Sequence, residues 1–157
     1  MRSRLWALIK TAIFTIFIPG TVAVYVPFRL TRGAIGRLPS DWIGGLALLP
    51  ILFGIVFHLF SAWHFAVTGL GTPAPIDPPR TLVVRGPYRL TRNPLYVGVV
   101  SVLFGEALMV RSLALTEYAA AVFMAFYAFV LVYEEPVLRD KFGTAYIEYC
   151  AKVPRWV

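Results

Sequence analysis

Residues 42–67 read WIGGLALLPILFGIVFHLFSAWHFAV and contain no lysine, arginine, aspartate or glutamate. A helix that crosses a bilayer needs about 20 mostly apolar residues, and this stretch is longer than that. The whole chain of 157 residues is 59% hydrophobic, with a mean hydropathy of +0.72. Both values are well above those of soluble domains. The stretch therefore predicts an integral membrane protein.

Three further segments, residues 5–28, 95–110 and 113–133, are apolar enough to span or nearly span a membrane. Only two residues separate the last two, so we expect a tight helical hairpin there. The first has the charged and apolar parts of a signal peptide but no clear small-x-small cleavage site, which favours a retained span. The sequence predicts an all-α fold: a single domain over residues 1–157, forming an integral membrane helical bundle of about four transmembrane helices.

The distribution of charge predicts how this bundle is oriented. The chain carries 15 Lys and Arg against 8 Asp and Glu, for a net charge of +7. Most of the basic residues lie near the two termini and in the loop over residues 70–94. Cytoplasmic loops carry such an excess, so both termini and this loop are expected in the cytoplasm, with the spans in an inner or plasma membrane. The charge then reflects anionic lipid rather than nucleic acid as a partner.

Two segments outside the spans have a distinct character. The loop over residues 70–94 is rich in proline and glycine and cannot be a regular helix through its proline cluster. The last span is expected to break at Glu134-Glu135-Pro136, since proline disfavours helical geometry in the residue before it. Apolar residues then recur at roughly helical spacing over residues 136–150, which predicts an amphipathic helix on the cytoplasmic interface.

The third span opens with residues 86–98, GPYRLTRNPLYVG. Asn93 is suited to cap a helix and Pro94 to its first turn, so both have a purely structural explanation. Arg92 is explained equally by the excess of cations at cytoplasmic surfaces. However, a helix N-terminus flanked by arginines also binds carboxylates and phosphates, and the two tyrosines of this stretch could attract a cation.

The adjacent acids Glu134 and Glu135 are the second candidate group. They are explained either as surface charges or as ligand-binding carboxylates on the same predicted membrane face as Arg92. A ligand that carries both an ammonium and a carboxylate would need this mixture of charges. Two acids could also bind a ribose diol through paired hydrogen bonds.

Other features give weaker signals. Gly69 and Gly71 form a G-x-G at the end of the second span, where glycines also terminate helices. His58, His64 and Glu106 lie inside the predicted membrane, where ionisable residues are functional candidates. The two histidines are not on one helical face, and the single cysteine excludes a disulfide and a zinc-finger framework. The sequence therefore predicts no metal site.

Together, the stretches GLGTPAPIDPPRTLVVRGPYRLTRNPLYVG and EEPVLRDKFGTAYIEYCAKVPRW resemble the isoprenylcysteine carboxyl methyltransferase and phospholipid methyltransferase families of integral membrane enzymes. The resemblance covers about half of the chain. It implies that S-adenosylmethionine binds between the third and fourth helices and the C-terminal region. Carried over by position, the cofactor contacts are Thr81, Leu82, Val83, Tyr88, Asn93, Pro94, Leu95, Tyr96 and Glu134. The phospholipid branch adds Gly69, Gly71 and Glu135.

The chain departs from this pattern at two positions. Asn93 stands where the pattern has histidine. Val130 or its apolar neighbours replace an arginine of the isoprenylcysteine enzymes, which argues against a prenylcysteine carboxylate as substrate. Methyl transfer mainly requires two reactants to be positioned in line, and we expect Arg92 to orient an anionic group of substrate or cofactor.

Two other functions remain as alternatives. Membrane sterol reductases, which use NADPH, share part of this pattern but are usually longer. A non-catalytic membrane interaction module would bind no ligand at all. Even within the methyltransferase hypothesis, the acceptor is left open as a lipophilic or small molecule methylated on oxygen, nitrogen or sulfur.

Overall fold

The structure, a computed structural model, describes residues 2–37, 41–69 and 79–156 and contains no β-strand within these ranges. Three helical runs, Leu5–Leu30, Trp42–Gly69 and Leu113–Phe142, are long and apolar enough to cross a membrane. This confirms the predicted all-α membrane bundle. The third expected span is α4 (Pro94–Val110), which is apolar but shorter than the other three.

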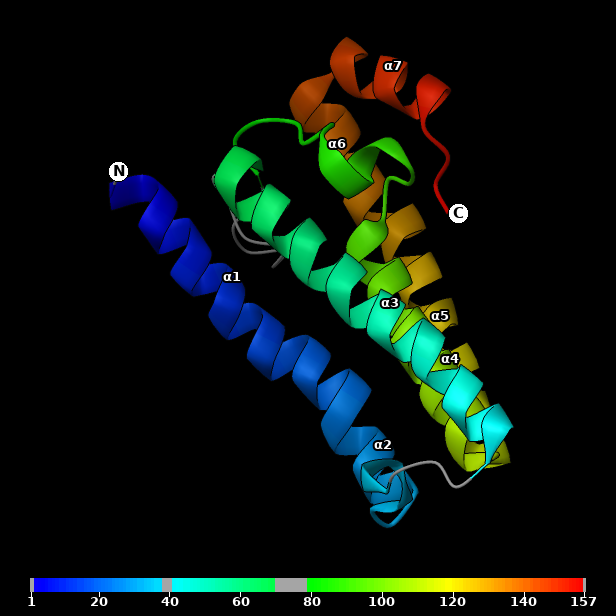
Figure 1. Cartoon of the computed structure of the whole chain (residues 1–157). Coiled ribbons are helices and arrows are strands. Elements are labelled where there is room, and N and C mark those ends of the chain that lie inside the picture. The colour runs from blue at the N-terminus through cyan, green and yellow to red at the C-terminus, as the bar shows by residue number, and fades with distance from the viewer. Residues whose placement is uncertain (1, 38–40, 70–78, 157) are drawn as a thin grey trace.

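Each long run begins with an α-helix that continues into a π-helical turn. In the first and last runs a second α-helix follows this turn. The first comprises α1 (Arg2–Gly20), η1 (Thr21–Tyr25) and α2 (Val26–Leu30), followed by the 3-10 turn η2 (Ala34–Gly36). The second comprises α3 (Trp42–His64) and η3 (Phe65–Gly69), and the 3-10 turn η4 (Gly86–Arg89) precedes α4. The last comprises α5 (Leu113–Phe129), η5 (Val130–Glu134) and α6 (Glu135–Phe142), with α7 (Thr144–Lys152) after it. Both chain ends lie at one end of the bundle, and the turn between α4 and α5 lies at the other (Figure 1).

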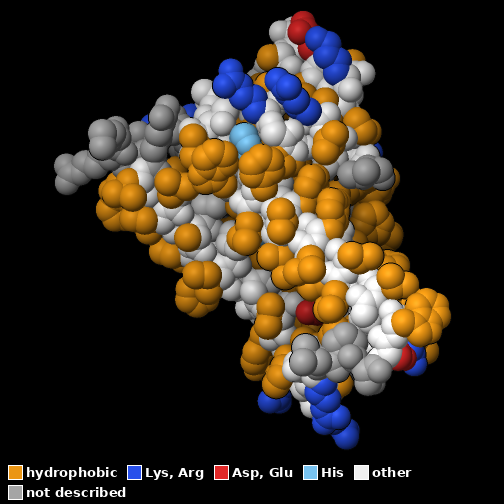
Figure 2. Space-filling view, viewed as in Figure 1, with side chains coloured by type: hydrophobic (Ala, Val, Ile, Leu, Met, Phe, Trp, Pro, Cys, Tyr) orange, Lys and Arg blue, Asp and Glu red, His pale blue; other side chains and the backbone are white. Residues whose placement is uncertain are grey.

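The surface matches a bilayer rather than water. Figure 2 shows hydrophobic side chains over the middle of one face and Lys and Arg side chains near its two ends. Large side chains such as Phe53, Val56 and Leu59 on α3 are exposed. Apolar faces this continuous are expected where lipid tails are the solvent.

Glycines bring α3 and α4 into close contact. A Cβ atom added to Gly54 would lie 2.5 Å from the carbonyl oxygen of Gly98, and one added to Gly105 would lie 2.9 Å from the carbonyl oxygen of Ala47. Small residues at such positions let helix backbones approach one another in membranes. This contact fixes the position of α4, whose first turn carries much of the candidate site.

The α4–α5 connection is the tight hairpin expected from the sequence. Arg111 takes a left-handed conformation (φ 50°), and the Ser112 hydroxyl accepts a hydrogen bond from the backbone N–H of Leu115. Arg111 also forms an ion pair with Asp41, which caps α3 by accepting from the Gly44 N–H at 2.8 Å. The Gly44 hydrogen bond, followed by Arg111, lowers the pKa of the Asp41 carboxyl below its ordinary value.

The expected break at Glu134-Glu135-Pro136 is wrong. Glu134 and Glu135 both have helical dihedral angles, and the helix continues through Pro136 to Phe142. The turn before the proline is π-helical, which widens the backbone where a proline ring would otherwise clash with the preceding turn. The turn η1 occupies the same position before Pro27.

The expected helix over 136–150 is in fact two helices. The chain turns at Gly143, whose φ of 54° is a left-handed value that glycine adopts readily. Tyr146 and Tyr149 of α7 then pack with Val153, together with Leu82 from the loop after α3. The apolar face of α7 therefore covers the end of the bundle that holds the candidate site.

Candidate functional site

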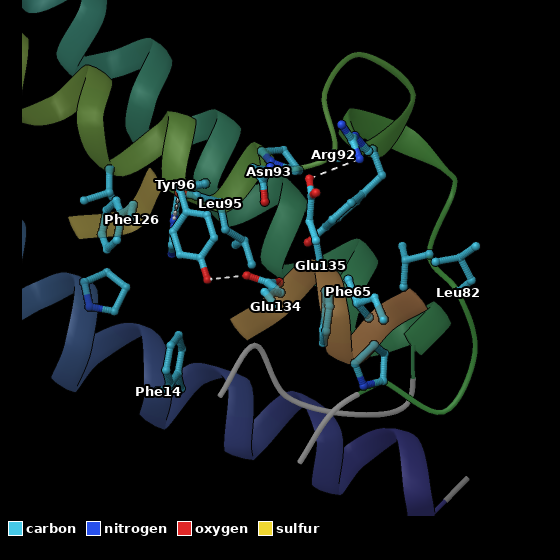
Figure 3. A pocket seen from close by; sticks show the side chains of 18 of the residues that line it. Phe14, Phe65, Leu82, Arg92, Asn93, Leu95, Tyr96, Phe126, Glu134 and Glu135 are labelled. Atoms are coloured by element: carbon cyan, nitrogen blue, oxygen red, sulfur yellow. Dashed lines mark hydrogen bonds and ion pairs between the residues drawn. The ribbon is translucent and has the colours of Figure 1, made fainter. Parts of the chain in front are cut away.

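A cavity lies where α1, the loop before α4, the first turn of α4 and the junction of η5 with α6 converge. It encloses about 950 Å³ of space not filled by atoms, part of which is open to solvent. Aromatic and aliphatic side chains dominate one side, where Phe126 of α5 lies beside Tyr96 of α4 and Phe14 comes from α1 (Figure 3). Arg92 and Glu135 lie on the other side (Figure 3). The cavity thus has a polar and an apolar end, as small-molecule sites commonly do.

Glu134 and Tyr96 form a pair between these two ends. The Tyr96 hydroxyl donates a hydrogen bond of 2.8 Å to Oε2 of Glu134 (Figure 3). The Tyr96 ring in turn packs on Phe126, with ring centroids 4.7 Å apart. These contacts orient the Glu134 carboxylate, and the Tyr96 hydrogen bond engages one of its two oxygens.

Glu135 is held differently, although it is the next residue. Nε and Nη2 of Arg155 donate to its two oxygens at 2.7 and 2.9 Å, and Nη1 of Arg92 lies 3.1 Å from Oε1. Such a paired geometry is the strongest arrangement for an arginine and a carboxylate. The hydrogen bond with Glu135 raises the pKa of Arg155 above its ordinary value. Glu135 thereby joins three segments: α6, the residues before α4 and the C-terminal segment.

Arg92 has contacts on several sides. Its backbone N–H donates to the Pro154 carbonyl at 2.9 Å, and Nη1 donates to the Cys150 sulfur at 2.7 Å. Its Nε is buried and has no hydrogen-bond partner among the residues described. A buried guanidinium N–H without a partner is unusual, and a ligand acceptor that reached it would satisfy it.

The C-terminal segment is fastened to the residues that open α4. The Thr91 hydroxyl and the Asn93 side-chain amide donate to the Arg155 carbonyl at 2.8 and 3.0 Å. Asn93 occupies the N-cap position, but its side chain makes no capping hydrogen bond, contrary to the sequence-based expectation. The amide is used instead for a contact between segments that are far apart in the sequence.

Tyr88 is a second polar group with an unused atom in the cavity. Its side chain is buried, its hydroxyl has no partner among the residues described, and its carbonyl accepts a hydrogen bond of 2.6 Å from the Tyr149 hydroxyl. Burial, with a further contribution from Glu134, raises the pKa of Tyr88 well above its ordinary value. The phenol therefore stays protonated and can donate a hydrogen bond.

The order of these groups along the chain is matched by a known family. A model of phospholipid methyltransferases matches residues 42–145. This chain belongs to the phospholipid methyltransferase family. The match confirms the resemblance seen in the sequence.

Two relatives of this family member are informative. This chain is 38% identical over 137 residues to the cobalt-zinc-cadmium resistance protein CzcN of Cupriavidus metallidurans. The match covers 86% of this chain and 61% of that protein. The chain is 34% identical over 76 residues to protein-S-isoprenylcysteine O-methyltransferase B of Arabidopsis thaliana, covering 48% of this chain and 39% of that enzyme. The chain thus spans less than two thirds of either relative. No solved structure matches it.

Most residues suggested for cofactor binding by the resemblance do line the cavity of this family member. Those that line it, together with the proposed catalytic Arg92, are Leu82, Val83, Tyr88, Asn93, Pro94, Leu95, Tyr96, Glu134 and Glu135. Their roles stay predictions.

Gly69 and Thr81 are not among the residues that line the cavity. The Gly69 carbonyl accepts from the Arg80 N–H at 2.8 Å, and the Thr81 hydroxyl donates to the Thr68 carbonyl at 2.6 Å. A Cβ atom added to Gly69 would lie 3.0 Å from Val83. Both residues therefore attach the loop before α4 to η3. Gly71 lies outside the described residues.

Several lining residues were missed by the sequence reasoning. They are Phe14, Ile18, Pro19 and Val22 of the first span, Phe65 of the second, Pro79, Val99, Phe126, Leu138, and Tyr146 and Tyr149 of α7. An apolar residue in a span carries no signal, because lipid and an apolar cavity favour the same side chains. Arg155 was also missed, although it ends the Val-Pro-Arg of the second resemblance stretch, which was the available signal.

The remaining intramembrane candidates divide between the site and its surroundings. His58 lines the cavity, whereas His64 packs edge-on against Phe60 and Trp63. Glu106 is buried in α4 away from the cavity. Among the described residues, no three His, Cys, Asp or Glu side chains are placed to hold a metal ion.

Proposed function

We propose that this membrane methyltransferase family member transfers a methyl group from S-adenosylmethionine to a lipophilic or small acceptor at the cytoplasmic membrane interface. The observation that carries the proposal is the Glu134–Tyr96 pair, which lies between an arginine-bearing end and an apolar end of one cavity. A polar cofactor and an apolar acceptor need adjoining sites of these two kinds. S-adenosylmethionine supplies a methyl group on a positively charged sulfur.

The chain's own residues fit the cofactor's functional groups. Nε of Arg92 has no protein partner and would donate to a carboxylate. Glu134 would accept from an ammonium or from the ribose hydroxyls, while Tyr96 keeps it oriented. The aromatic faces of Tyr88 and Tyr96 line the same cavity and would attract a cationic sulfur.

Glu135 has a supporting role in this arrangement. Both of its oxygens bind arginine side chains, so it positions Arg92 and the C-terminal segment. Neutralising Arg92 with Glu135 also keeps the polar end close to electrically balanced. A zwitterionic ligand group can then enter without leaving a buried charge unpaired.

The acceptor would bind at the apolar end. Phe14, Ile18 and Val22 of the first span face it, together with Val99 and Phe126. These side chains exclude water from the reacting atoms, which favours a displacement that disperses the charge of the sulfonium. An acceptor that partitions into lipid would reach this end from within the membrane.

Isothermal titration of the full-length protein in lipid nanodiscs tests the proposal. S-adenosylhomocysteine, which has the cofactor's carboxylate, ammonium and ribose, is expected to bind, and NADPH is not. Binding of NADPH alone would favour a reductase. Binding of neither would favour a non-catalytic interaction module, and both of these results would contradict the proposal.

A further inference from the structure

The cavity contains a histidine that takes no part in the network around Glu135. His58 of α3 lines the cavity, and its side chain is buried, with 7% of the residue exposed. Its Nδ1 lies 3.0 Å from the carbonyl oxygen of Leu95, and its Nε2 is buried without a partner among the described residues. A buried polar atom without a partner calls for an explanation.

The hydrogen bond to Leu95 determines which ring nitrogen is available. A carbonyl oxygen only accepts hydrogen bonds, so Nδ1 must carry the hydrogen. In the neutral ring, Nε2 then has a free lone pair and can accept a hydrogen or a proton. This is the arrangement of a general base whose second nitrogen is oriented by a fixed acceptor.

The helix contact holds this ring in place. A Cβ atom added to Gly98 would lie 2.7 Å from Cβ of His58 and 2.9 Å from its backbone nitrogen. Gly98 thus brings the α4 backbone directly against His58, and the Leu95 carbonyl comes from the same helix. The ring is fixed by backbone atoms, which makes its orientation more precise than side-chain packing alone would.

His58 also lies close to the residues that orient the site. It bonds to Leu95, which lines the cavity and directly precedes Tyr96, the partner of Glu134. Among the described residues, Arg92 is the cationic side chain that lines the cavity, and it already binds Glu135. His58 therefore adds a lone pair to a cavity whose cationic side chain is already paired.

We infer that Nε2 of His58 takes a proton from the methyl acceptor, so that the acceptor is a hydroxyl, thiol or amine (X–H) rather than a carboxylate. This inference rests on the proposed methyl transfer. A carboxylate has no proton to give at neutral pH and would need a cation beside it. A neutral X–H group needs a base, and the histidine lone pair matches it.

The step balances in atoms and charge. The X–H proton moves to Nε2, and the electron pair on X forms the new bond to the methyl carbon. The electrons of the broken carbon–sulfur bond stay on sulfur, which becomes a neutral thioether. The positive charge passes from the sulfonium to the imidazolium, and the imidazolium releases its proton to water as the product leaves.

His58→Gln tests the inference, with His64→Gln as the matched control. Both histidines are in α3, but His64 does not line the cavity. The full-length proteins in nanodiscs are assayed with radiolabelled S-adenosylmethionine at pH 7. The acceptors are a panel of thiophenols of graded acidity, a long-chain alcohol, a long-chain amine and a fatty acid. Binding of S-adenosylhomocysteine by titration serves as a second measurement.

The wild type is expected to methylate X–H acceptors and not the fatty acid. His58→Gln should lower kcat by about 100-fold or more on weakly acidic thiophenols, the alcohol or the amine, as for loss of a general base. It should retain activity on thiophenols that are already ionised, and it should bind S-adenosylhomocysteine as the wild type does. His64→Gln should resemble the wild type throughout.

Three outcomes would overturn the inference while leaving the proposed function in place. They are transfer to the fatty acid alone, transfer to none of these acceptors despite cofactor binding, and an equal loss on ionised and un-ionised thiophenols in His58→Gln. The last result, like loss of cofactor binding in that variant, would assign His58 a purely structural role. Failure of the wild type to bind S-adenosylhomocysteine would instead contradict the proposed function itself.

Discussion

Two neighbouring acids in this protein have different environments. Glu134 receives one hydrogen bond from Tyr96, whereas Glu135 is enclosed by Arg92 and Arg155. The carboxylate with one protein partner can bind a ligand, and the carboxylate with two arginines can hold segments together. Each residue therefore has its own test, ligand affinity for Glu134 and stability of the fold for Glu135.

Glu134→Gln is expected to weaken S-adenosylhomocysteine binding by at least about tenfold, or roughly 1.4 kcal/mol, because a charge-assisted contact to the ligand is lost. Titration calorimetry measures the change. The control is Glu117→Gln, which removes an exposed acid from the same helical run and should leave affinity unchanged. Equal affinities for all three proteins would contradict a role for Glu134.

Glu135→Gln is expected to lower the free energy of unfolding by about 2 kcal/mol, since it removes a buried charge that both arginines share. The measurement is the thermal midpoint of the protein in detergent. Glu148→Gln changes an exposed acid of α7 and should leave the midpoint in place. A midpoint as high in Glu135→Gln as in the wild type would show that the arginine contacts do not stabilise the fold.

At the scale of elements, the spans were predictable and their internal geometry was not. Long apolar stretches locate helices in membranes, because every backbone group must be satisfied internally. However, the rule that a proline discourages helical geometry in the residue before it failed at Pro136. The π turn η5 widens the backbone there and makes room for the proline ring. The local sequence does not show whether a helix will break or widen, because packing around the turn decides.

The close α3–α4 contact gives a prediction at this scale. Gly98→Ala is expected to destabilise the protein by about 1–3 kcal/mol, because the new methyl group would meet backbone atoms of His58 and Gly54. Gly45→Ala in α3 is the control, since a Cβ atom there meets nothing within 4 Å. It should be neutral or stabilising by up to about 1 kcal/mol, through helix propensity. Thermal denaturation in detergent compares the two variants, and equal destabilisation would contradict the packing argument.

At the scale of the whole molecule, the site assembles from segments that are distant in sequence. The resemblance stretches located the residues from 82 to 96 and the acid pair, because charges, tyrosines and a helix start are distinctive in a hydrophobic chain. The wall contributed by α1 and the ring of His58 could not be located in the same way. Which face of a span meets protein depends on the tertiary arrangement, and apolar composition is the same on both faces.

The helix order also predicts the topology. With both chain ends at one end of the bundle, a fluorescent protein fused after Val157 should fluoresce in the cytoplasm. Alkaline phosphatase inserted after Arg37, between the first two long runs, should be active outside it. Phosphatase at the C-terminus is the control and should be inactive. The reverse pattern would place the cavity's polar end on the other side of the membrane and contradict a cytoplasmic cofactor site.

The turn η5 has a consequence for how this chain tolerates change. A π turn holds one residue more than an α turn, so removing one residue from 130–133 would restore a regular helix. Everything after it would keep nearly the same rotation about the helix axis, because the π turn already absorbs the extra residue. Leu131, Val132 and Tyr133 are exposed toward lipid, where another apolar residue would serve equally well. Yet the regular helix left by a deletion would bring the ring of Pro136 against the preceding turn. This segment therefore contributes through its length more than through its side chains.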